Sequence, residues 1–266
     1  MKQLIISLLF LAFGFLTFGQ TSNVDIKATQ KTLAKINDTL YASKYEVTNQ
    51  QYKTFLNFLK QNNQTEKYAA AQIDTAQWTS TFAYNKPYVE YYHSHPAYEN
   101  YPVVNISYEG ATLFCEWLTE QYNNNDKRKY QKVEFRLPTE TEWTTAAKGG
   151  NITAIYPWEG SNLKSKKGLY RCNFTRSKED YKGVAGTLND NADVTAPSKS
   201  YWPNTFGLYN MSGNVAEMLL ETGTTKGGSW QDSSEAMKIE SQGKHARFNT
   251  PQPAIGFRFF MEIIEK

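Results

Sequence analysis

The segment that most constrains this chain runs from residue 204 to residue 217 and reads NTFGLYNMSGNVAE. Its second half has the pattern N-x-x-G-N-V-x-E, which places a side-chain amide, backbone carbonyls and a carboxylate within eight residues. Those groups are hard oxygen ligands in a tight turn, the kind of set that Ca²⁺ takes in proteins. The segment therefore predicts an ordered, loop-rich region with the donors for a cation.

The first residues are typical of an export signal. Lys2 supplies a positive charge, Leu4 to Phe18 form an apolar run, and Thr17-Phe18-Gly19 is a small-x-small cleavage site. We expect residues 1–19 to be removed as a signal peptide, which places the protein in the periplasm or outside the cell. A single membrane anchor is the alternative, but the run is shorter than the roughly 20 residues that span a bilayer.

The composition excludes some partners. The net charge is +3 and no basic tract stands out, so nucleic-acid binding is not indicated. An aromatic content of 15% suits a fold in which large side chains fill space between loops.

Cys115 and Cys172 could pair in an exported protein, but nothing in their spacing favours a bridge, and we expect Cys115 to be a buried free thiol. After the signal we expect an N-terminal arm at 20–40 and one domain at 41–266.

Local patterns predict an α+β domain with few helices, a small antiparallel sheet and much ordered loop. We expect helices to begin at Thr48, Ser107 and Thr139, because each is a capping residue before an apolar stripe, and Thr48 and Thr139 have capping-box partners. These helices should end near Lys60, Tyr122 and Gly149. Strands are expected at 44–47, 102–106, 133–137, near 227–230 and at 256–264. The stretch 67–101 has weak periodicity and is interpreted as irregular structure with short strands.

Seven sequence blocks occur in order along the chain: 45–49, 102–109, 136–143, 156–158, 204–217, 226–230 and 256–258. On these blocks the chain resembles the formylglycine-generating enzyme (sulfatase-modifying factor) family from about Tyr45 to Phe260. The resemblance implies a variant C-type-lectin-like fold with bound Ca²⁺. The stretch from His95 into Val104 is also similar to the gliding-motility (type IX secretion) lipoprotein branch, although this chain lacks a lipid-accepting cysteine.

The resemblance implies one Ca²⁺ site in the segment at 204–217. Its ligands would be the side chains of Asn210 and Glu217 and the backbone carbonyls of Gly213 and Val215. The alternative is a turn followed by a helix, in which Asn210 caps and Glu217 faces water.

A second implied Ca²⁺ site lies just before Thr195-Ala196-Pro197. Its residues would be Asn173, Phe174, Asp190 and Ala192. Ala192 replaces the aromatic residue usual in the family, but it would contribute only its carbonyl. A solvent-exposed acidic loop is the alternative.

The resemblance fails at the catalytic centre of the family. The family enzyme holds copper between two cysteines, since thiolates suit Cu(I), and those positions are Asp232 and Met237 here. Ser229 is retained, whereas Ala216 and Ala254 replace a tryptophan and an asparagine of the family. We therefore expect that oxygen-dependent thiol oxidation has been lost.

Other catalytic chemistry finds little support in the sequence. His93, His95 and His245 are the only histidines, and His93 and His95 would share one face if they lay on a strand. Related sulfoxide synthases hold iron with three histidines, but take them from an additional helical domain that this chain lacks. Ordinary hydrogen-bonded or exposed histidines are the favoured interpretation. The chain has no P-loop, no G-x-S-x-G and no H-E-x-x-H motif.

These patterns together predict an exported, non-catalytic, calcium-stabilised domain. Its expected role is binding or scaffolding in a bacterial envelope or secreted assembly, with a protein or glycan partner, a step that rests on analogy of fold. The alternative is an enzyme of the same family with altered oxidative chemistry.

Overall fold

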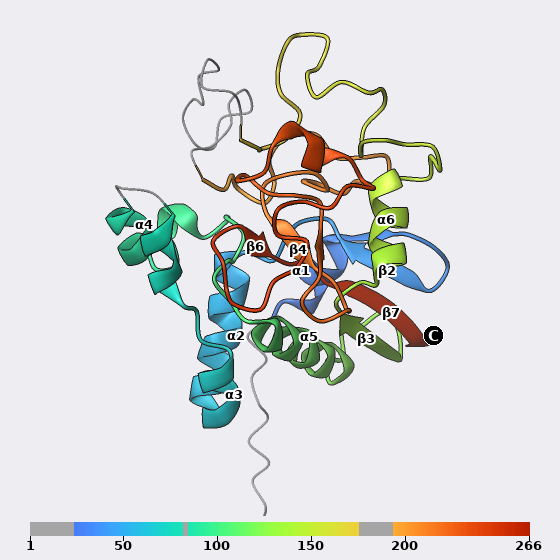
Figure 1. Cartoon of the computed structure of the whole chain (residues 1–266). Helices are drawn as coiled ribbons and strands as arrows, with labels where there is room; N and C mark the ends of the chain where they lie inside the picture. Colours follow the sequence, from blue (N-terminus) through green and yellow to red (C-terminus); the bar gives the residue numbers. More distant parts are fainter. Residues whose placement is uncertain (1–23, 82–84, 176–193) are drawn as a thin grey trace, which may run out of the picture.

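A four-stranded antiparallel sheet joins the two ends of the described chain. The computed structural model describes residues 24–81, 85–175 and 194–266. The sheet has the order β1-β2-β7-β3. Its strands are β1 (Leu33–Lys35), β2 (Leu40–Ser43), β7 (Phe260–Glu265) and β3 (Lys132–Arg136). The C-terminal strand β7 thus lies between a strand from the start of the chain and one from its middle (Figure 1).

A second, three-stranded sheet lies in the loop-rich half and has the order β5-β4-β6. Its short strands are β4 (Ala216–Met218), β5 (Thr225–Lys226) and β6 (Ile255–Gly256). The pair β4–β5 is antiparallel, whereas β4–β6 is parallel. The predicted α+β fold with small sheets and much loop is confirmed, with one parallel pairing added.

The three long helices begin where their capping residues predicted. Their bounds are α2 (Asn49–Gln61), α5 (Tyr108–Asn123) and α6 (Glu140–Lys148). Capping boxes at Thr48 and Thr139 open α2 and α6, and the Ser107 hydroxyl accepts from the backbone of Gly110 to open α5. These caps satisfy backbone N–H groups that the first helical turn leaves without partners. Helix α6 ends at Gly149 in the left-handed conformation, as expected for a glycine C-cap.

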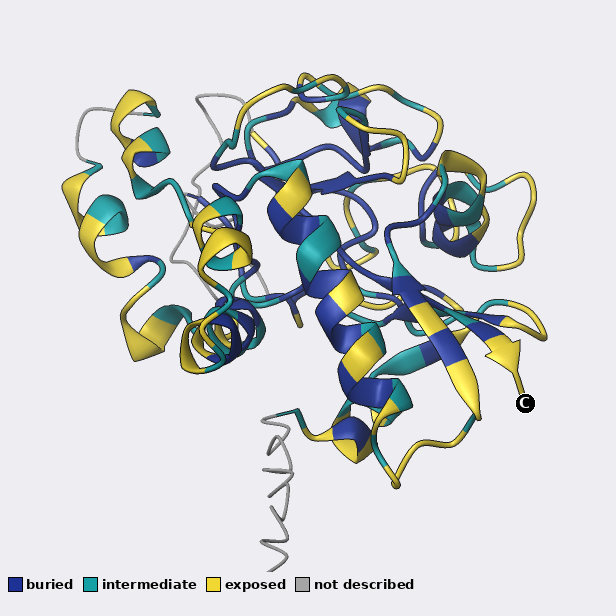
Figure 2. Cartoon of the chain, turned by 90° about the horizontal axis from the view of Figure 1, so that it is seen from below, coloured by how far each residue is buried: buried dark blue, intermediate teal, exposed yellow. Residues whose placement is uncertain are grey.

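The main core forms where α5 packs on the four-stranded sheet. Figure 2 shows the buried stripe of α5 facing the interior and its exposed stripe facing solvent. Phe114 of α5 contacts Phe257, with ring centroids 5.5 Å apart, and Tyr122 contacts Phe135 of β3 at the same distance. Burying each such ring contributes roughly 1.5–3 kcal/mol, so this interface holds α5 on the sheet.

Several strand predictions were wrong. Strand β2 ends at Ser43, before the predicted strand at 44–47, and the buried segment 102–106 forms only an isolated bridge between Thr48 and Pro102. The segment 227–230 follows β5 rather than forming a strand. A β-strand forms where another segment of the chain pairs with it, and the local sequence does not indicate which segment that is.

The stretch 67–101 is helical, not strand-like, in its described part. It contains the end of α3 (Thr65–Ala70), the 3₁₀ helices η1 (Thr75–Ser80) and η2 (Pro96–Tyr98), and α4 (Lys86–Tyr91). Each is one or two turns long, too short to give a clear period in the sequence.

The described part of the expected N-terminal arm is folded. Helix α1 (Ile26–Lys31) and strand β1 both lie within it, and Ile26 is buried in the main core. Cys115 and Cys172 are both buried and are not joined by a disulfide, and Cys115 is the buried thiol that we expected. The predicted signal peptide lies outside the described residues. Of the helices that the structure describes, none has the length and apolar character to cross a membrane.

Candidate functional site

The turn at 210–214 is held in an unusual backbone conformation. Asn210, Gly213 and Asn214 have positive φ values of 54°, 74° and 68°, in the left-handed region that glycine and asparagine tolerate best. A Cβ atom on Gly213 would lie 2.2 Å from the carbonyl oxygen of Asn173. Asn214 donates its backbone N–H to that same oxygen at 2.8 Å. The N-x-x-G-N pattern is therefore required by close packing against the loop at residue 173.

This turn directs two amide side chains at a buried acid. Glu46, between β2 and α2, accepts a hydrogen bond from Asn210 Nδ2 at 3.0 Å and another from Asn214 Nδ2 at 2.9 Å. Its side chain is fully buried. Burial, followed by repulsion from Glu217, raises the pKa of Glu46 to about 8, although Arg258 and the two amides oppose that rise. Glu46 is therefore mainly protonated at neutral pH.

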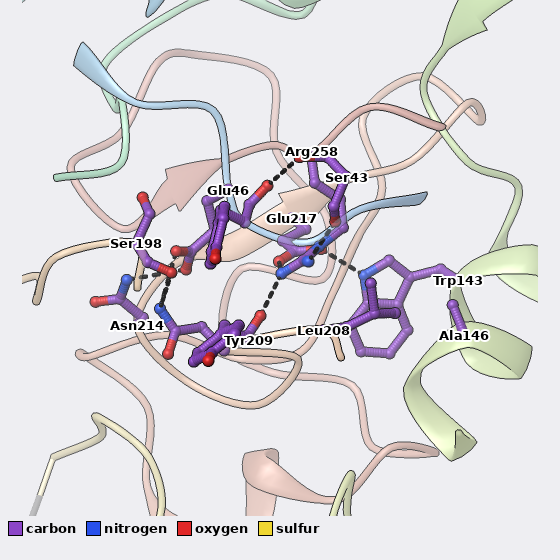
Figure 3. Close-up of polar contacts among 12 residues, drawn as sticks. Ser43, Glu46, Trp143, Ala146, Ser198, Leu208, Tyr209, Asn214, Glu217 and Arg258 are labelled. Carbon is purple, nitrogen blue, oxygen red and sulfur yellow. Dashed lines mark hydrogen bonds and ion pairs between the residues drawn. The ribbon is translucent and has the colours of Figure 1, made fainter. Parts of the chain in front are cut away.

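Beside Glu46, a second buried acid pairs with an arginine (Figure 3). Glu217 on β4 accepts from Arg258 Nε at 2.6 Å and from Arg258 Nη2 at 2.5 Å. Trp143 reaches in from α6 and donates its indole N–H to Glu217 at 2.7 Å. Arg258 also donates to the carbonyl oxygens of Ser43 and Tyr209. One guanidinium thus joins the end of β2, the loop before the turn, and β4.

We refer to six residues together as the buried polar cluster: Glu46, Trp143, Asn210, Asn214, Glu217 and Arg258. The cluster draws on segments far apart in the sequence. Its ion pair is bidentate, with side chains 0% and 1% exposed. Such a pair has its charges matched, but removing one partner would leave an uncompensated buried charge.

The first predicted Ca²⁺ site overlaps this cluster. Asn210 Oδ1 is buried and has no hydrogen-bond partner among the described residues. From the described part of the chain, Glu217 Oε1 accepts one hydrogen bond, donated by Arg258, so it keeps one acceptor position. The alternative in which Glu217 faces water is wrong, since this side chain is 1% exposed. The structure thus brings Asn210 and Glu217 into one cluster, in which Trp143 and Arg258 already bond the Glu217 carboxylate.

The structure describes half of the second predicted Ca²⁺ site. Asn173 donates its amide to the carbonyl oxygen of Val194 at 2.7 Å, while its own Oδ1 is buried without a partner in the described chain. Phe174 is buried and packs edge-on against Tyr170. Asp190 and Ala192 lie outside the described residues. Each of the two predicted sites thus has one buried oxygen without a hydrogen-bond partner among the described residues.

The residues at the expected copper positions are engaged elsewhere. Asp232 accepts from the backbone N–H and the hydroxyl of Ser229, at 2.9 and 2.6 Å, and from the backbone N–H of Lys244 at 2.5 Å. Met237 is 0% exposed and packs in an apolar cluster with Cys172. Asp232 therefore connects two loops, and Met237 fills a core.

The two alanines that differ from the family are also part of the framework. Ala216 and Ala254 are buried, and Ala216 N donates to Ala254 O at 2.9 Å beside the parallel pairing of β4 with β6.

A polar cavity of about 520 Å³ lies beside Asp232, and we call it the Trp230 pocket. Its lining consists of Gln77, Ser80, Thr81, Thr175, Trp230, Gln231, Lys244, His245, Thr250, Gln252 and Pro253. His245 is buried, lies 3.2 Å from Gln231 Oε1 through Nε2, and also hydrogen-bonds Gln252. Burial lowers its pKa, so the ring is neutral near neutral pH.

The histidines do not form the strand-face pair that we considered. His93 lies at the end of α4, where it hydrogen-bonds Asn49 at 3.0 Å and burial lowers its pKa to about 3. His95 is exposed and caps η2 through its ring. His245 belongs to the Trp230 pocket. Within the residues that the structure describes, no three His, Cys, Asp or Glu side chains gather as a metal-binding group.

Sequence reasoning missed three members of the buried polar cluster. Glu46, Trp143 and Arg258 stand in the blocks 45–49, 136–143 and 256–258, but were not assigned to any site. A signal was present, because each of the three is a charged or aromatic residue within one of the seven sequence blocks. Their shared contacts come from the fold, since Glu46 and Asn214 are 168 residues apart.

The fold and the buried polar cluster together define a loop-rich α+β domain built around a glutamate–arginine pair. The chain belongs to the sulfatase-modifying factor enzyme 1-like domain family, whose profile matches residues 3–263. The formylglycine-generating enzyme of Thermomonospora curvata is 36% identical over 44% of this chain and 32% of its own length. The chain thus spans about a third of that relative.

Other relatives carry different descriptions. The inactive C-alpha-formylglycine-generating enzyme 2 of Bos taurus is 28% identical over 59% of this chain and 49% of its own length. Among solved structures, CarF has a TM-score of 0.52 and 22% identity, covering 87% of this chain and 93% of its own. That likeness shows the fold alone. Membership of the family is compatible with either activity or inactivity.

Proposed function

We propose that this protein is a non-catalytic binding domain of the sulfatase-modifying factor fold. The carrying observation is the engagement of Asp232, which stands where the resemblance calls for a copper-binding cysteine. Its carboxylate accepts three hydrogen bonds, two from Ser229 and one from Lys244. A residue that connects two loops in this way serves the framework of the domain.

The donor chemistry supports the same proposal. Cu(I) favours soft thiolates, whereas Asp232 offers a hard carboxylate and Met237 a neutral thioether inside an apolar cluster. A bis-thiolate centre cannot be rebuilt from these groups. The relative named as inactive shows that loss of activity has a place within the family.

The test is copper loading of the purified protein followed by reaction with a cysteine-containing sulfatase peptide. We expect no stoichiometric copper, no thiol-dependent oxygen consumption, and no formylglycine by mass spectrometry above a no-protein control. The Thermomonospora curvata relative, named as a formylglycine-generating enzyme, serves as the positive control. Formylglycine formed by this chain would overturn the proposal in favour of an enzyme with altered oxidative chemistry.

We propose further that Ca²⁺ binds at the turn through Asn210, Gly213, Val215 and Glu217. The support is the buried, unpartnered Asn210 Oδ1 and the acceptor position left on Glu217 Oε1. A bound cation would tie these oxygens together and rigidify the turn. Asn173, Phe174, Asp190 and Ala192 remain a proposal for a second Ca²⁺.

Calcium should therefore raise the thermal stability of the domain. Binding to the native state alone adds about 2.7 kcal/mol when free Ca²⁺ is roughly 100 times its dissociation constant. Asn210→Gly keeps the positive φ but removes the amide oxygen, so the difference between calcium and chelator should shrink in that variant. Mg²⁺ should substitute poorly because it requires stricter octahedral geometry. Identical melting temperatures in Ca²⁺, Mg²⁺ and chelator, with no calcium found by elemental analysis, would contradict the proposal.

The proposed place of action is the periplasm or the exterior of the cell, supported by the apolar leader at residues 1–19. A protein or glycan of the envelope is the proposed partner, and similarity to the gliding-motility branch suggests a secretion-linked assembly. Pull-down of the mature protein from its native envelope would identify the partner.

A further inference from the structure

We propose that the Trp230 pocket binds an acidic saccharide, with Lys244 recognising the carboxylate of a uronic acid. The inference rests on the proposed binding function and adds to it a site and a ligand class. Its volume of about 520 Å³ lies within the range of small-molecule sites. The pocket differs from the buried polar cluster in that its polar groups open toward solvent.

A buried histidine holds two of the lining glutamines in place. His245 is 6% exposed and contacts Gln231 Oε1 through Nε2, while a further hydrogen bond joins it to Gln252. A neutral imidazole offers one donor and one acceptor, so it can fix two amides at once. Gln231 Nε2 donates to none of the described residues and stays available. The two amides are thus oriented before any ligand arrives.

The loop that carries Lys244 is fixed by its backbone, which leaves its side chain free. Asp232 accepts the Lys244 backbone N–H, and a Cβ on Gly243 would lie 3.2 Å from Asp232 Oδ1. The Lys244 side chain is exposed and makes no ion pair with the described part of the chain. An ammonium group on a fixed loop can form a charge-assisted hydrogen bond with a carboxylate.

The remaining lining suits hydroxyl groups. The pocket is lined by Gln77, Ser80, Thr81, Thr175 and Thr250. The hydroxyls of Ser80, Thr81 and Thr175 donate to backbone carbonyl oxygens and Gln77 Nε2 donates to Asp74, so these side chains keep oxygen acceptor positions for the hydroxyl groups of a sugar. Trp230 supplies an apolar wall. Among the residues that the structure describes, the lining contains one lysine and no carboxylate, which favours an acidic ligand over a basic one.

A peptide is the less suitable occupant. Extended peptides commonly bind by adding a strand to an exposed sheet edge. The lining residues come from η1, its C-cap and loops, and none lies in a strand. The pocket therefore lacks a backbone edge for a peptide but retains the side chains that a sugar needs.

Isothermal titration of the purified protein with digalacturonic acid and with a neutral disaccharide of the same size tests the inference. We expect the diuronate to bind about tenfold more tightly than the neutral sugar, the usual scale for one hydrogen bond to a charged group. Lys244→Ala should remove that preference, while Lys60→Ala, an exposed lysine on α2, should keep it. Gln231→Ala should weaken both sugars to the same extent, by about fivefold.

Two results would overturn the inference. One is the absence of binding by either sugar at millimolar concentration in a folded protein, checked by circular dichroism. The other is an acidic peptide that binds in a Lys244-dependent manner when the diuronate does not, which would assign the pocket to a protein partner. Either result leaves the non-catalytic proposal intact, because copper uptake and formylglycine formation test that proposal independently.

Discussion

The buried polar cluster and the Trp230 pocket are built from similar residues but use them in opposite ways. In the cluster, Glu46, Glu217 and Arg258 are no more than 1% exposed, and their polar atoms bond to other members of the cluster or to backbone carbonyl oxygens. In the pocket, Lys244 is exposed and the Gln231 amide nitrogen donates to none of the described residues. Apart from the oxygens proposed to hold Ca²⁺, the groups of the cluster are engaged with each other and stabilise the fold, whereas the groups left available in the pocket can bind an organic ligand. The two regions should therefore respond differently to substitution.

The largest effect should follow from breaking the ion pair of the cluster. Arg258→Met would leave Glu217 buried without its partner, which costs about 3–5 kcal/mol of unfolding free energy. In a domain of this size that corresponds to a fall in melting temperature of roughly 6–20 °C. Urea denaturation of the wild type and the variant measures this loss of unfolding free energy.

Arg247→Met, at an exposed arginine, is the matched control and should change stability by no more than about 0.5 kcal/mol. The double variant Glu217→Met/Arg258→Met should recover part of the loss, because the buried charge is then gone. A loss below about 1 kcal/mol for Arg258→Met alone would indicate that another cation compensates Glu217.

The second effect is a pH dependence that originates at Glu46. Its pKa is about 8 in the folded protein against an ordinary value of 4.5. Between these values the native state holds one proton more than the unfolded state, so stability falls as pH rises, by at most about 1.4 kcal/mol per pH unit. Glu46→Gln mimics the protonated acid and should abolish this part of the dependence.

The measurement is urea denaturation at several values between pH 5 and pH 8 in the presence of chelator. Wild type and Glu46→Gln should be similar at pH 5, with the variant more stable at pH 8. Glu134→Gln, at an exposed glutamate on β3, controls for the change of net charge. Parallel curves for wild type and Glu46→Gln would show that Glu46 ionises in the folded protein much as it does in the unfolded chain.

The helices could be predicted because their signals are local. Thr48, Ser107 and Thr139 cap helices within three residues of themselves, and the structure confirms all three. The strands were less predictable, since β2 depends on β7, more than 200 residues away. The strand predicted at 44–47 therefore begins just after the observed strand β2, which ends at Ser43.

The candidate site was predictable to the same limited extent. The turn residues Asn210 and Gly213 lie in one motif, so the sequence alone predicted that they belong to one site. Trp143 and Arg258 join Glu217 across 74 and 41 residues, and only the fold reveals these contacts. The Trp230 pocket combines side chains from η1 with side chains from later loops, and no local sequence motif predicts that they line one cavity.

A third prediction concerns Asp232, which borders the pocket but is itself buried. Asp232→Asn replaces one accepting oxygen with a donor that faces N–H groups of Ser229 or Lys244. We expect a loss of about 1–3 kcal/mol in unfolding free energy, the cost of an unsatisfied buried group. Uronate affinity should fall as well, because the loop at Lys244 loosens. Unchanged stability, measured by urea denaturation, would mean that the loop is held by other contacts.

The smallest effect on stability should come from the pocket itself. The Lys244 side chain is exposed and unpaired among the described residues, so Lys244→Ala removes no contact on which the fold depends. Its unfolding free energy should stay within about 0.5 kcal/mol of the wild type, and the same is expected of Lys60→Ala. The two variants should therefore be alike in urea denaturation and differ only in uronate titration. A Lys244→Ala variant that lost as much unfolding free energy as Arg258→Met would contradict the comparison between the two regions. The lysine would then stabilise the fold and would not be part of a binding surface.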